Sequence, residues 1–257
     1  MLISNSSKFI YIHIHKCAGS SVEVALNSTM KWNDLLLGTT DDGEKLAKIY
    51  DSRFGLSKHV SACQIRDVVG AEVWEQYYTF STVRHPFRRV VSIFNYIASI
   101  AEPIITDGHI SMPTSGVQSW LDSTEFPPES PLSWPAVQAY LIARQANRSF
   151  STFIRHPAIL SHDVAFETQH SRLADQYGNI IVDGAFCVEK LDETWPEICR
   201  KIGVPTMPLA RENVTNRRFS VPAHELLRDS GDRLFIHERF QVDFEAFGYN
   251  PSNFQTG

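Results

Sequence analysis

Two short segments of the chain combine basic, hydroxyl and glycine residues in a way that suits anion binding. The first, His15–Ser21 (HKCAGSS), brings a lysine, a glycine and two serines to the expected start of a helix. Backbone N–H groups and the positive end of a helix dipole attract phosphate at such a position. The segment is not a Walker A loop, G-x-x-x-x-G-K-[ST], because its lysine precedes its only glycine. By itself it fits a plain strand-to-helix turn equally well.

The second segment is Thr82–Ser92 (TVRHPFRRVVS). Arg84 closes an expected strand, and Ser92 follows eight residues later on an expected helix, so that a planar guanidinium and a hydroxyl can converge on one phosphate group. Arg84 paired with a core carboxylate and Ser92 facing solvent remain open alternatives. Two such segments, each at the carboxyl end of a strand, indicate a ligand with two separated anionic groups.

The elements that position these segments form two strand-loop-helix units. Residues 8–14 are short, β-branched and aromatic, as in a buried strand, and 20–26 have helical spacing. Residues 78–83 form a second expected strand, which Pro86 ends, and 87–101 carry an apolar helical stripe.

The rest of the chain gives weaker signals. Residues 27–58 predict a polar loop with at most one short helix, and Ser61 predicts the start of a helix that Gly70 weakens. Residues 102–135 hold six of the 13 prolines and predict an irregular region. Further predictions are helices at 134–146, 192–202 and within 223–240, and a strand at 179–188. With neither a repeat nor a linker in view, we predict one α/β domain over 1–257.

Composition excludes several classes of protein. The chain has 257 residues, with 24 Lys+Arg against 29 Asp+Glu, and its net charge of −5 argues against sequence-independent binding to nucleic acid. The four cysteines show neither disulfide density nor zinc spacing, and no His/Asp cluster predicts a metal. Because we find no signal peptide and no apolar run of about 18 residues, we expect a cytoplasmic protein without a membrane anchor.

Both segments resemble signatures of the sulfotransferases that use 3′-phosphoadenosine 5′-phosphosulfate (PAPS). His15–Ser21 resembles their 5′-phosphosulfate loop, and Thr82–Ser92 resembles their 3′-phosphate signature. The similarity is greatest to the carbohydrate branch, which includes the heparan and chondroitin sulfotransferases and bacterial relatives. Residues 182–191 and 243–249 resemble the family's late strand and closing segment. The match is poor over 102–175.

The resemblance implies a P-loop-like three-layer fold with a central, mostly parallel sheet flanked by helices. It also implies roles for individual residues. His59 would be the base that deprotonates the acceptor, with Glu23 as the fallback, and Lys16 would stabilise the leaving group. The donor-binding set would be Lys16, Cys17, Ala18, Gly19, Ser20, Ser21, Arg84 and Ser92, together with Arg217 and Arg218 on a loop that closes over the nucleotide.

This chain also departs from the family pattern. The loop usually reads Pro-Lys-Thr, whereas His15, Lys16 and Cys17 stand here. Cys17 as a nucleophile is rejected, because direct sulfuryl transfer needs no covalent intermediate. Residues from about 102 to 175 would form an acceptor-side insertion that includes the irregular region. This insertion would line the site that binds the acceptor, a small-molecule or saccharide alcohol.

The resulting hypothesis is an O-sulfotransferase that moves a sulfuryl group from PAPS to a hydroxyl by in-line displacement, without a metal. Two alternatives stay open. One is a P-loop-type nucleotide kinase or phosphotransferase, which the failed Walker pattern and the lack of an acidic Mg²⁺ motif disfavour. The other is a non-catalytic nucleotide-binding protein, which the joint presence of Lys16, His59, Arg84 and Ser92 disfavours.

Overall fold

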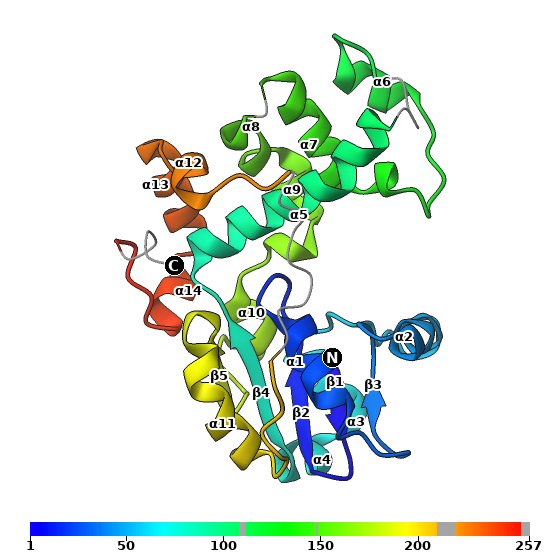
Figure 1. The fold of residues 1–257 in the computed structure, drawn as a ribbon, viewed down its shortest axis with the longest axis vertical. Coiled ribbons are helices and arrows are strands. Elements are labelled where there is room, and N and C mark those ends of the chain that lie inside the picture. Colours follow the sequence, from blue (N-terminus) through cyan, green and yellow to red (C-terminus); the bar gives the residue numbers. More distant parts are fainter. Residues whose placement is uncertain (108–111, 148, 210–218, 253–257) are drawn as a thin grey trace. The chain divides into compact units, whose positions relative to one another are not determined.

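The structure is a computed structural model that describes residues 1–107, 112–147, 149–209 and 219–252. The chain divides into two compact units, which we describe separately (Figure 1). Unit one comprises residues 1–86, 168–213 and 240–257, and unit two comprises 87–167 and 214–239. Each unit is therefore assembled from segments far apart in the sequence. The prediction of a single domain stays a prediction.

Unit one contains a five-stranded sheet in the order β3-β1-β2-β4-β5. The strands are β1 (Leu2–Ser4), β2 (Phe9–Ile12), β3 (Leu35–Leu36), β4 (Tyr78–Val83) and β5 (Gly184–Cys187). β2 pairs in parallel with β4, and β4 with β5, whereas β1 is antiparallel to both β2 and β3. The prediction of a mostly parallel sheet is thus only partly correct. The cause is the opening hairpin, in which β1 returns directly into β2 without a crossover helix.

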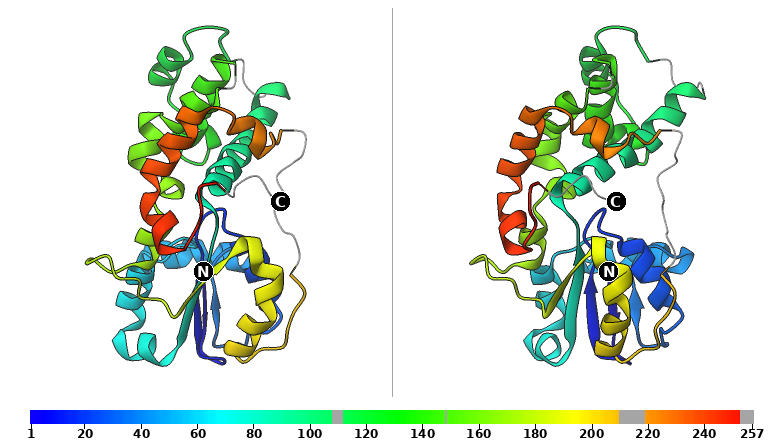
Figure 2. Two further views of the ribbon diagram at one scale, coloured as in Figure 1. Left: turned by 90° about the vertical axis from the view of Figure 1, so that its left-hand side faces the viewer. Right: turned by 60° about the vertical axis from the view of Figure 1, so that its left-hand side comes forward.

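Helices cover both faces of this sheet, which makes three layers. Phe9 and Tyr11 of β2 point to one face, where α1 (Gly19–Asn27) and α11 (Leu191–Lys201) pack on them. Ile10 and Ile12 point to the other face, toward α3 (Ala62–Val69) and α4 (Ala71–Gln76). Figure 2 shows the yellow α11 and the cyan α4 on opposite sides of the strands. The alternation follows from the two-residue period of a strand that is buried on both faces.

The predicted elements around the two segments are confirmed with small shifts. The first strand and helix appear as β2 and α1, and the second pair as β4 and α5 (Pro86–Thr106). The helix expected after Ser61 breaks into α3 and α4 at Gly70, whose φ of 84° is strained for other residues. The late strand is shorter than predicted, because Ile180 turns back to form an isolated bridge with Ala174.

One prediction in this unit is only partly correct. The stretch expected to be a loop with at most one short helix contains the 14-residue helix α2 (Asp41–Phe54). Thr40 caps its first turn by accepting a hydrogen bond from Gly43 N–H, and three acidic residues follow the cap. Only Gly43 of this helix is buried, and its charged residues outnumber its apolar ones, which weakens the apolar stripe by which sequence patterns reveal helices. Unit one also contains α10 (Gln169–Leu173) and α14 (Gln241–Ala246).

The described part of unit two is helical. After α5 come α6 (Val117–Ser123), η1 (Pro131–Ser133), α7 (Pro135–Gln145), α8 (Phe150–Ile154), α9 (Pro157–His162), η2 (Val164–Phe166), α12 (Ala223–Leu226) and α13 (Ser230–Arg239). Its core includes an aromatic cluster in which Phe94 contacts Tyr140, Phe150 and Phe153. In the described part of 102–135, the region predicted as irregular, turns and coil separate the end of α5, α6 and η1. The helix predicted at 134–146 is confirmed as α7, which begins at a proline in the first helical position.

We expect Phe80→Ala to destabilise the protein by about 3–5 kcal/mol, because Phe80 is fully buried and its ring contacts Phe9, Tyr11, Tyr78 and Phe186. Urea unfolding measures this loss. Trp32→Ala is the control, since Trp32 is 96% exposed, and its effect should stay within about 0.5 kcal/mol. A similar small effect for both variants would contradict the packing described above.

Candidate active site

The loop between β2 and α1 has an unusual backbone. Lys16 (φ 63°) and Ala18 (φ 61°) both adopt the left-handed conformation, although neither is glycine. Non-glycine residues in this region carry strain, which concentrates at functional sites. Helix α1 has no side-chain cap at its N-terminus, and its hydrogen bonding begins with Val22 N–H donating to Ala18 C=O. The N–H groups of the first turn of a helix face its N-terminal end, which is where helices bind phosphate.

Gly19 is required by a close approach. A Cβ at this position would lie 2.1 Å from the imidazole of His13, which comes from the end of β2. Any side chain here would displace either the His13 ring or the start of α1. The glycine of the anion-binding segment thus lets an imidazole lie directly against the first turn of the helix.

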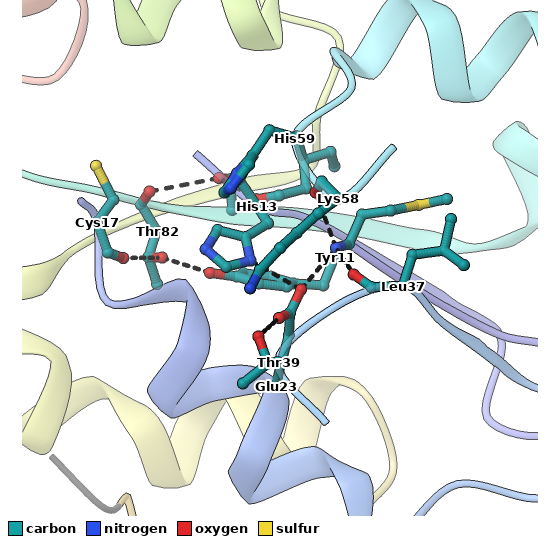
Figure 3. A network of polar contacts seen from close by, with 12 residues as sticks. Tyr11, His13, Cys17, Glu23, Leu37, Thr39, Lys58, His59 and Thr82 are labelled. Atoms are coloured by element: carbon teal, nitrogen blue, oxygen red, sulfur yellow. Dashed lines mark hydrogen bonds and ion pairs between the residues drawn. The ribbon is translucent and has the colours of Figure 1, made fainter. Parts of the chain in front are cut away.

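The His13 ring is held by a buried carboxylate on the same helix. Glu23 Oε1 accepts hydrogen bonds from His13 Nδ1 at 2.8 Å and from the Met1 α-amino group at 2.6 Å (Figure 3). Thr39 Oγ1 donates to the other carboxylate oxygen. Burial alone would raise the pKa of Glu23, but the His13 and Met1 partners lower it well below its usual range. Glu23 is therefore an ionised anchor with its oxygens engaged, which is a poor arrangement for a base.

His59 lies against the same loop through its ring. Its Nδ1 is 3.0 Å from the carbonyl oxygen of His13. Since a carbonyl only accepts, Nδ1 carries the proton and Nε2 keeps its lone pair. The His59 ring stacks on His15 with centroids 3.5 Å apart and meets His13 edge-on at 4.5 Å. Arg172 of α10 donates to the His59 carbonyl and thereby fixes its backbone.

These contacts determine the protonation of His59. Burial lowers its pKa well below the ordinary value, and the neighbouring His13 and His15 lower it further, because a second positive charge beside them is unfavourable. The hydrogen bond to the His13 carbonyl acts in the opposite direction without cancelling this effect. His59 is thus a neutral imidazole with one defined tautomer.

Hydrogen bonds from β4 fix the shape of the anion-binding loop. Thr82 Oγ1 donates to the Cys17 carbonyl at 2.5 Å, which leaves its oxygen to accept from Tyr11 OH at 2.7 Å. Arg84 Nη1 donates to the Lys16 carbonyl at 3.2 Å. Burial and the Arg84 charge lower the pKa of the Lys16 ammonium to about 8. An anion bound here would counteract both effects, so the loop is suited to a negatively charged ligand.

The turn that carries Arg84 is held by residues from the C-terminal half of the chain. Gln169 accepts from Arg84 N–H at 2.7 Å and donates to its C=O at 2.8 Å. Glu189 Oε1 accepts from the next N–H, that of His85, at 3.0 Å. Tyr249 OH donates to the Val83 carbonyl at 2.9 Å. Arg84 therefore projects from a rigid turn.

The structure brings most of the predicted site residues together in unit one. They are Lys16, Cys17, Ala18, Gly19, Ser20 and Ser21 in the loop, with His59 and Arg84 in contact with it. Ser92 lies on α5 in unit two, so its convergence with Arg84 stays a prediction. Arg217 and Arg218 lie outside the described residues.

The Cys17 side chain is buried and hydrogen-bonded. Its thiol is buried and donates to Gln169 Oε1 at 3.1 Å. Its backbone N–H donates to Ile14 C=O at 3.4 Å, and its C=O accepts from Thr82. Cys17 therefore holds the loop in place through its thiol, its N–H and its C=O.

Sequence reasoning missed two residues that the structure places at the centre of this arrangement. Gln169 is fully buried and contacts both Cys17 and Arg84, and Asp243 is fully buried and accepts from the backbone of α10. Only the resemblance of 243–249 to a closing segment marked Asp243. No motif marks Gln169, because its role depends on a contact with residues about 85 and 150 positions earlier.

A family model described as the sulfotransferase family matches residues 1–250. The chain belongs to the sulfotransferase family. No curated protein sequence and no solved structure matches it. The match covers both anion-binding segments and the irregular region that the sequence resemblance covered poorly.

Family membership makes this sulfotransferase an enzyme that transfers a sulfuryl group to an acceptor. Among the residues that the structure describes, no cluster of His, Cys, Asp and Glu is arranged to hold a metal ion. The helices of the described ranges include none with the length and hydropathy needed to cross a membrane.

We expect the His59 imidazole to stay neutral, with the proton on Nδ1, from pH 8 down to pH 5. The reason is that a pKa lowered by burial and by two neighbouring imidazoles leaves no titration near about 6.5, the ordinary value. Nitrogen-detected NMR of the histidine rings measures this, with His59→Gln to assign the signals. A His59 signal that moves to the imidazolium position near pH 6.5 would show that the stacked arrangement does not persist in solution.

Proposed function

We propose that this sulfotransferase moves a sulfuryl group from PAPS to a hydroxyl group, with His59 as the general base. The observation that carries the proposal is the fixed tautomer of His59. Its Nδ1–H is held by the His13 carbonyl beside the Lys16 loop, which leaves Nε2 to accept a proton. The oriented lone pair supports this role, and an anionic donor bound in the neighbouring loop would raise the lowered pKa of His59 toward the range in which it can hold a proton.

The residues present fit a donor with a charged 5′ group. The uncapped start of α1, with its first-turn N–H groups and the hydroxyls of Ser20 and Ser21, would hold the 5′-phosphosulfate. The Lys16 ammonium would lie at the oxygen that bridges sulfur and phosphorus. A pKa of about 8 lets it donate a proton or a strong hydrogen bond as negative charge develops there.

The bond changes then balance without a further reactant. The acceptor oxygen forms a bond to sulfur while the bond from sulfur to the 5′-phosphate oxygen breaks. His59 Nε2 takes the acceptor's proton, and the electron pair of the broken bond stays on the phosphate beside Lys16. Positioning and charge stabilisation supply the acceleration, as in phosphoryl transfer.

Arg84 and Ser92 are proposed to hold the 3′-phosphate, which distinguishes this donor from ADP and ATP. The rigid turn around Arg84 favours this role, because a guanidinium held by its backbone loses little freedom when it binds an anion. Arg217 and Arg218 are proposed to close over the nucleotide. The acceptor is proposed to be a small-molecule or saccharide alcohol, and a cytoplasmic location stays a prediction from the sequence.

The donor assignment predicts nucleotide selectivity. At about 100 times its Kd, adenosine 3′,5′-bisphosphate should stabilise the protein by about 2.7 kcal/mol and raise its Tm by about 5 °C or more. Adenosine 5′-monophosphate at the same concentration should raise it less, because it lacks the group that Arg84 would bind. Thermal unfolding with each nucleotide measures this. Stabilisation by ATP with Mg²⁺ alone would instead favour a kinase-like phosphotransferase.

The base assignment predicts a defect in turnover without a defect in donor binding. His59→Gln should lower the rate of sulfuryl transfer about 10²- to 10⁴-fold, since glutamine cannot accept the proton, and should change bisphosphate affinity little. The assay follows labelled PAPS with water, simple alcohols and aryl glycosides as acceptors. His224→Gln on α12 is the matched control, because His224 is 68% exposed, and it should be fully active. Full turnover in His59→Gln would show that His59 is not the base, and it would leave the family assignment unaffected.

A further inference from the structure

Both polar atoms of the Gln169 side-chain amide form hydrogen bonds, and these bonds reach both anion-binding segments of the candidate site. Its Oε1 accepts from Arg84 N–H at 2.7 Å and from the Cys17 thiol at 3.1 Å. Its Nε2 donates to Arg84 C=O at 2.8 Å and to Asp243 Oδ2 at 3.4 Å. The pairing with both backbone groups of Arg84 defines the orientation of the amide, because the oxygen must face the N–H and the nitrogen the C=O.

Asp243 fixes Gln169 in turn. Its Oδ2 accepts from the backbone N–H of Gln169 at 2.9 Å, and its Oδ1 accepts from that of His170 at 2.8 Å. Both Gln169 and Asp243 are fully buried. A buried amide whose polar atoms all bond to neighbouring groups has one permitted position, since any shift leaves polar groups without partners.

Gln169 therefore connects the two anion-binding segments. Its contact with Cys17 reaches the loop proposed for the 5′ group, and its contacts with Arg84 reach the residue proposed for the 3′-phosphate. Arg84 adds a second connection, because its guanidinium donates to the Lys16 carbonyl. A displacement of Gln169 would move the backbone of Arg84 and loosen the loop.

We propose that Gln169 is a positioning residue, held by Asp243, that sets the Arg84 guanidinium for the 3′-phosphate of the donor. This inference rests on the proposed function, because it takes Arg84 as the 3′-phosphate ligand. It assigns no contact between Gln169 and the donor itself. Gln169 acts through Arg84, and its loss should affect selectivity for the 3′-phosphate rather than nucleotide affinity in general.

The test compares affinities for adenosine 3′,5′-bisphosphate and adenosine 5′-monophosphate by calorimetry. The readout is the selectivity ratio, the Kd of the monophosphate divided by that of the bisphosphate. In Gln169→Met this ratio should fall about tenfold or more, because charge-assisted bonds to phosphate depend strongly on geometry, while monophosphate affinity should change less than about threefold. A merely structural role would weaken both nucleotides equally and leave the ratio unchanged.

Two further variants test whether Gln169 acts through Arg84. In an Arg84→Met background, Gln169→Met should cause no further loss of selectivity, because the group that it positions is already absent. Gln145→Met in unit two is the matched control. The Gln145 amide also bonds backbone on both sides, from Val117 N–H and to Thr114 C=O, and its loss should leave both affinities unchanged.

The outcomes separate this inference from the proposed function. If the wild-type protein prefers the bisphosphate and Gln169→Met keeps the same preference, the positioning role is overturned but the donor assignment stands. A wild-type protein that does not distinguish the two nucleotides overturns the donor assignment itself. If Gln169→Met does not fold, Asp243→Asn takes its place, because asparagine keeps the volume but cannot accept both backbone N–H groups as the carboxylate does. An unchanged ratio in Asp243→Asn also overturns the inference.

Discussion

The contact between the His13 imidazole and the bare Cα of Gly19 is the constraint on which the candidate site depends. It brings the end of β2 and the first turn of α1 closer than any side chain at position 19 would allow. Glu23 holds the ring from one side, and the backbone carbonyl of the same histidine orients His59. One residue thus sets both the start of the anion-binding helix and the tautomer of the proposed base. The left-handed residues of the loop persist because these contacts over-determine the backbone.

The second strand-loop-helix unit contributes rigidity as well as charge. Thr82 and Arg84 both donate to carbonyl groups of the first loop, so the end of β4 holds the loop in its strained form. The buried amide of Gln169 then ties the backbone of Arg84 to the Cys17 thiol. Charge and shape are therefore coupled, because the residues that would bind anions also form the hydrogen bonds that position one another.

Residue type and spacing were sufficient to predict β2, β4 and the helices after them, because these elements have strong periodicity and clear ends. The two anion-binding segments were recognised by their basic, hydroxyl and glycine residues and by their resemblance to family signatures. The length of helix α2 was underestimated because its residues are mostly polar, and the antiparallel β1 was missed because three residues carry no periodic signal. The positions of Gln169 and Asp243 depend on contacts between distant segments, which no local pattern encodes. The stacking of His15 on His59 belongs to the same class.

The interleaved order of the segments also bears on how the molecule folds. Arg84 lies in the first third of the chain, yet the residues that hold its turn are Gln169, Glu189 and Tyr249. During synthesis, β4 must wait for about 100 further residues before β5 can pair beside it. The anion-binding loop and the arginine turn can therefore reach their final form only late, after nearly the whole chain has emerged. Until then, a nascent or truncated chain would expose the unpaired edge of β4. Such an edge can pair with other chains and aggregate, so the late position of the supporting residues leaves the incomplete chain in need of protection.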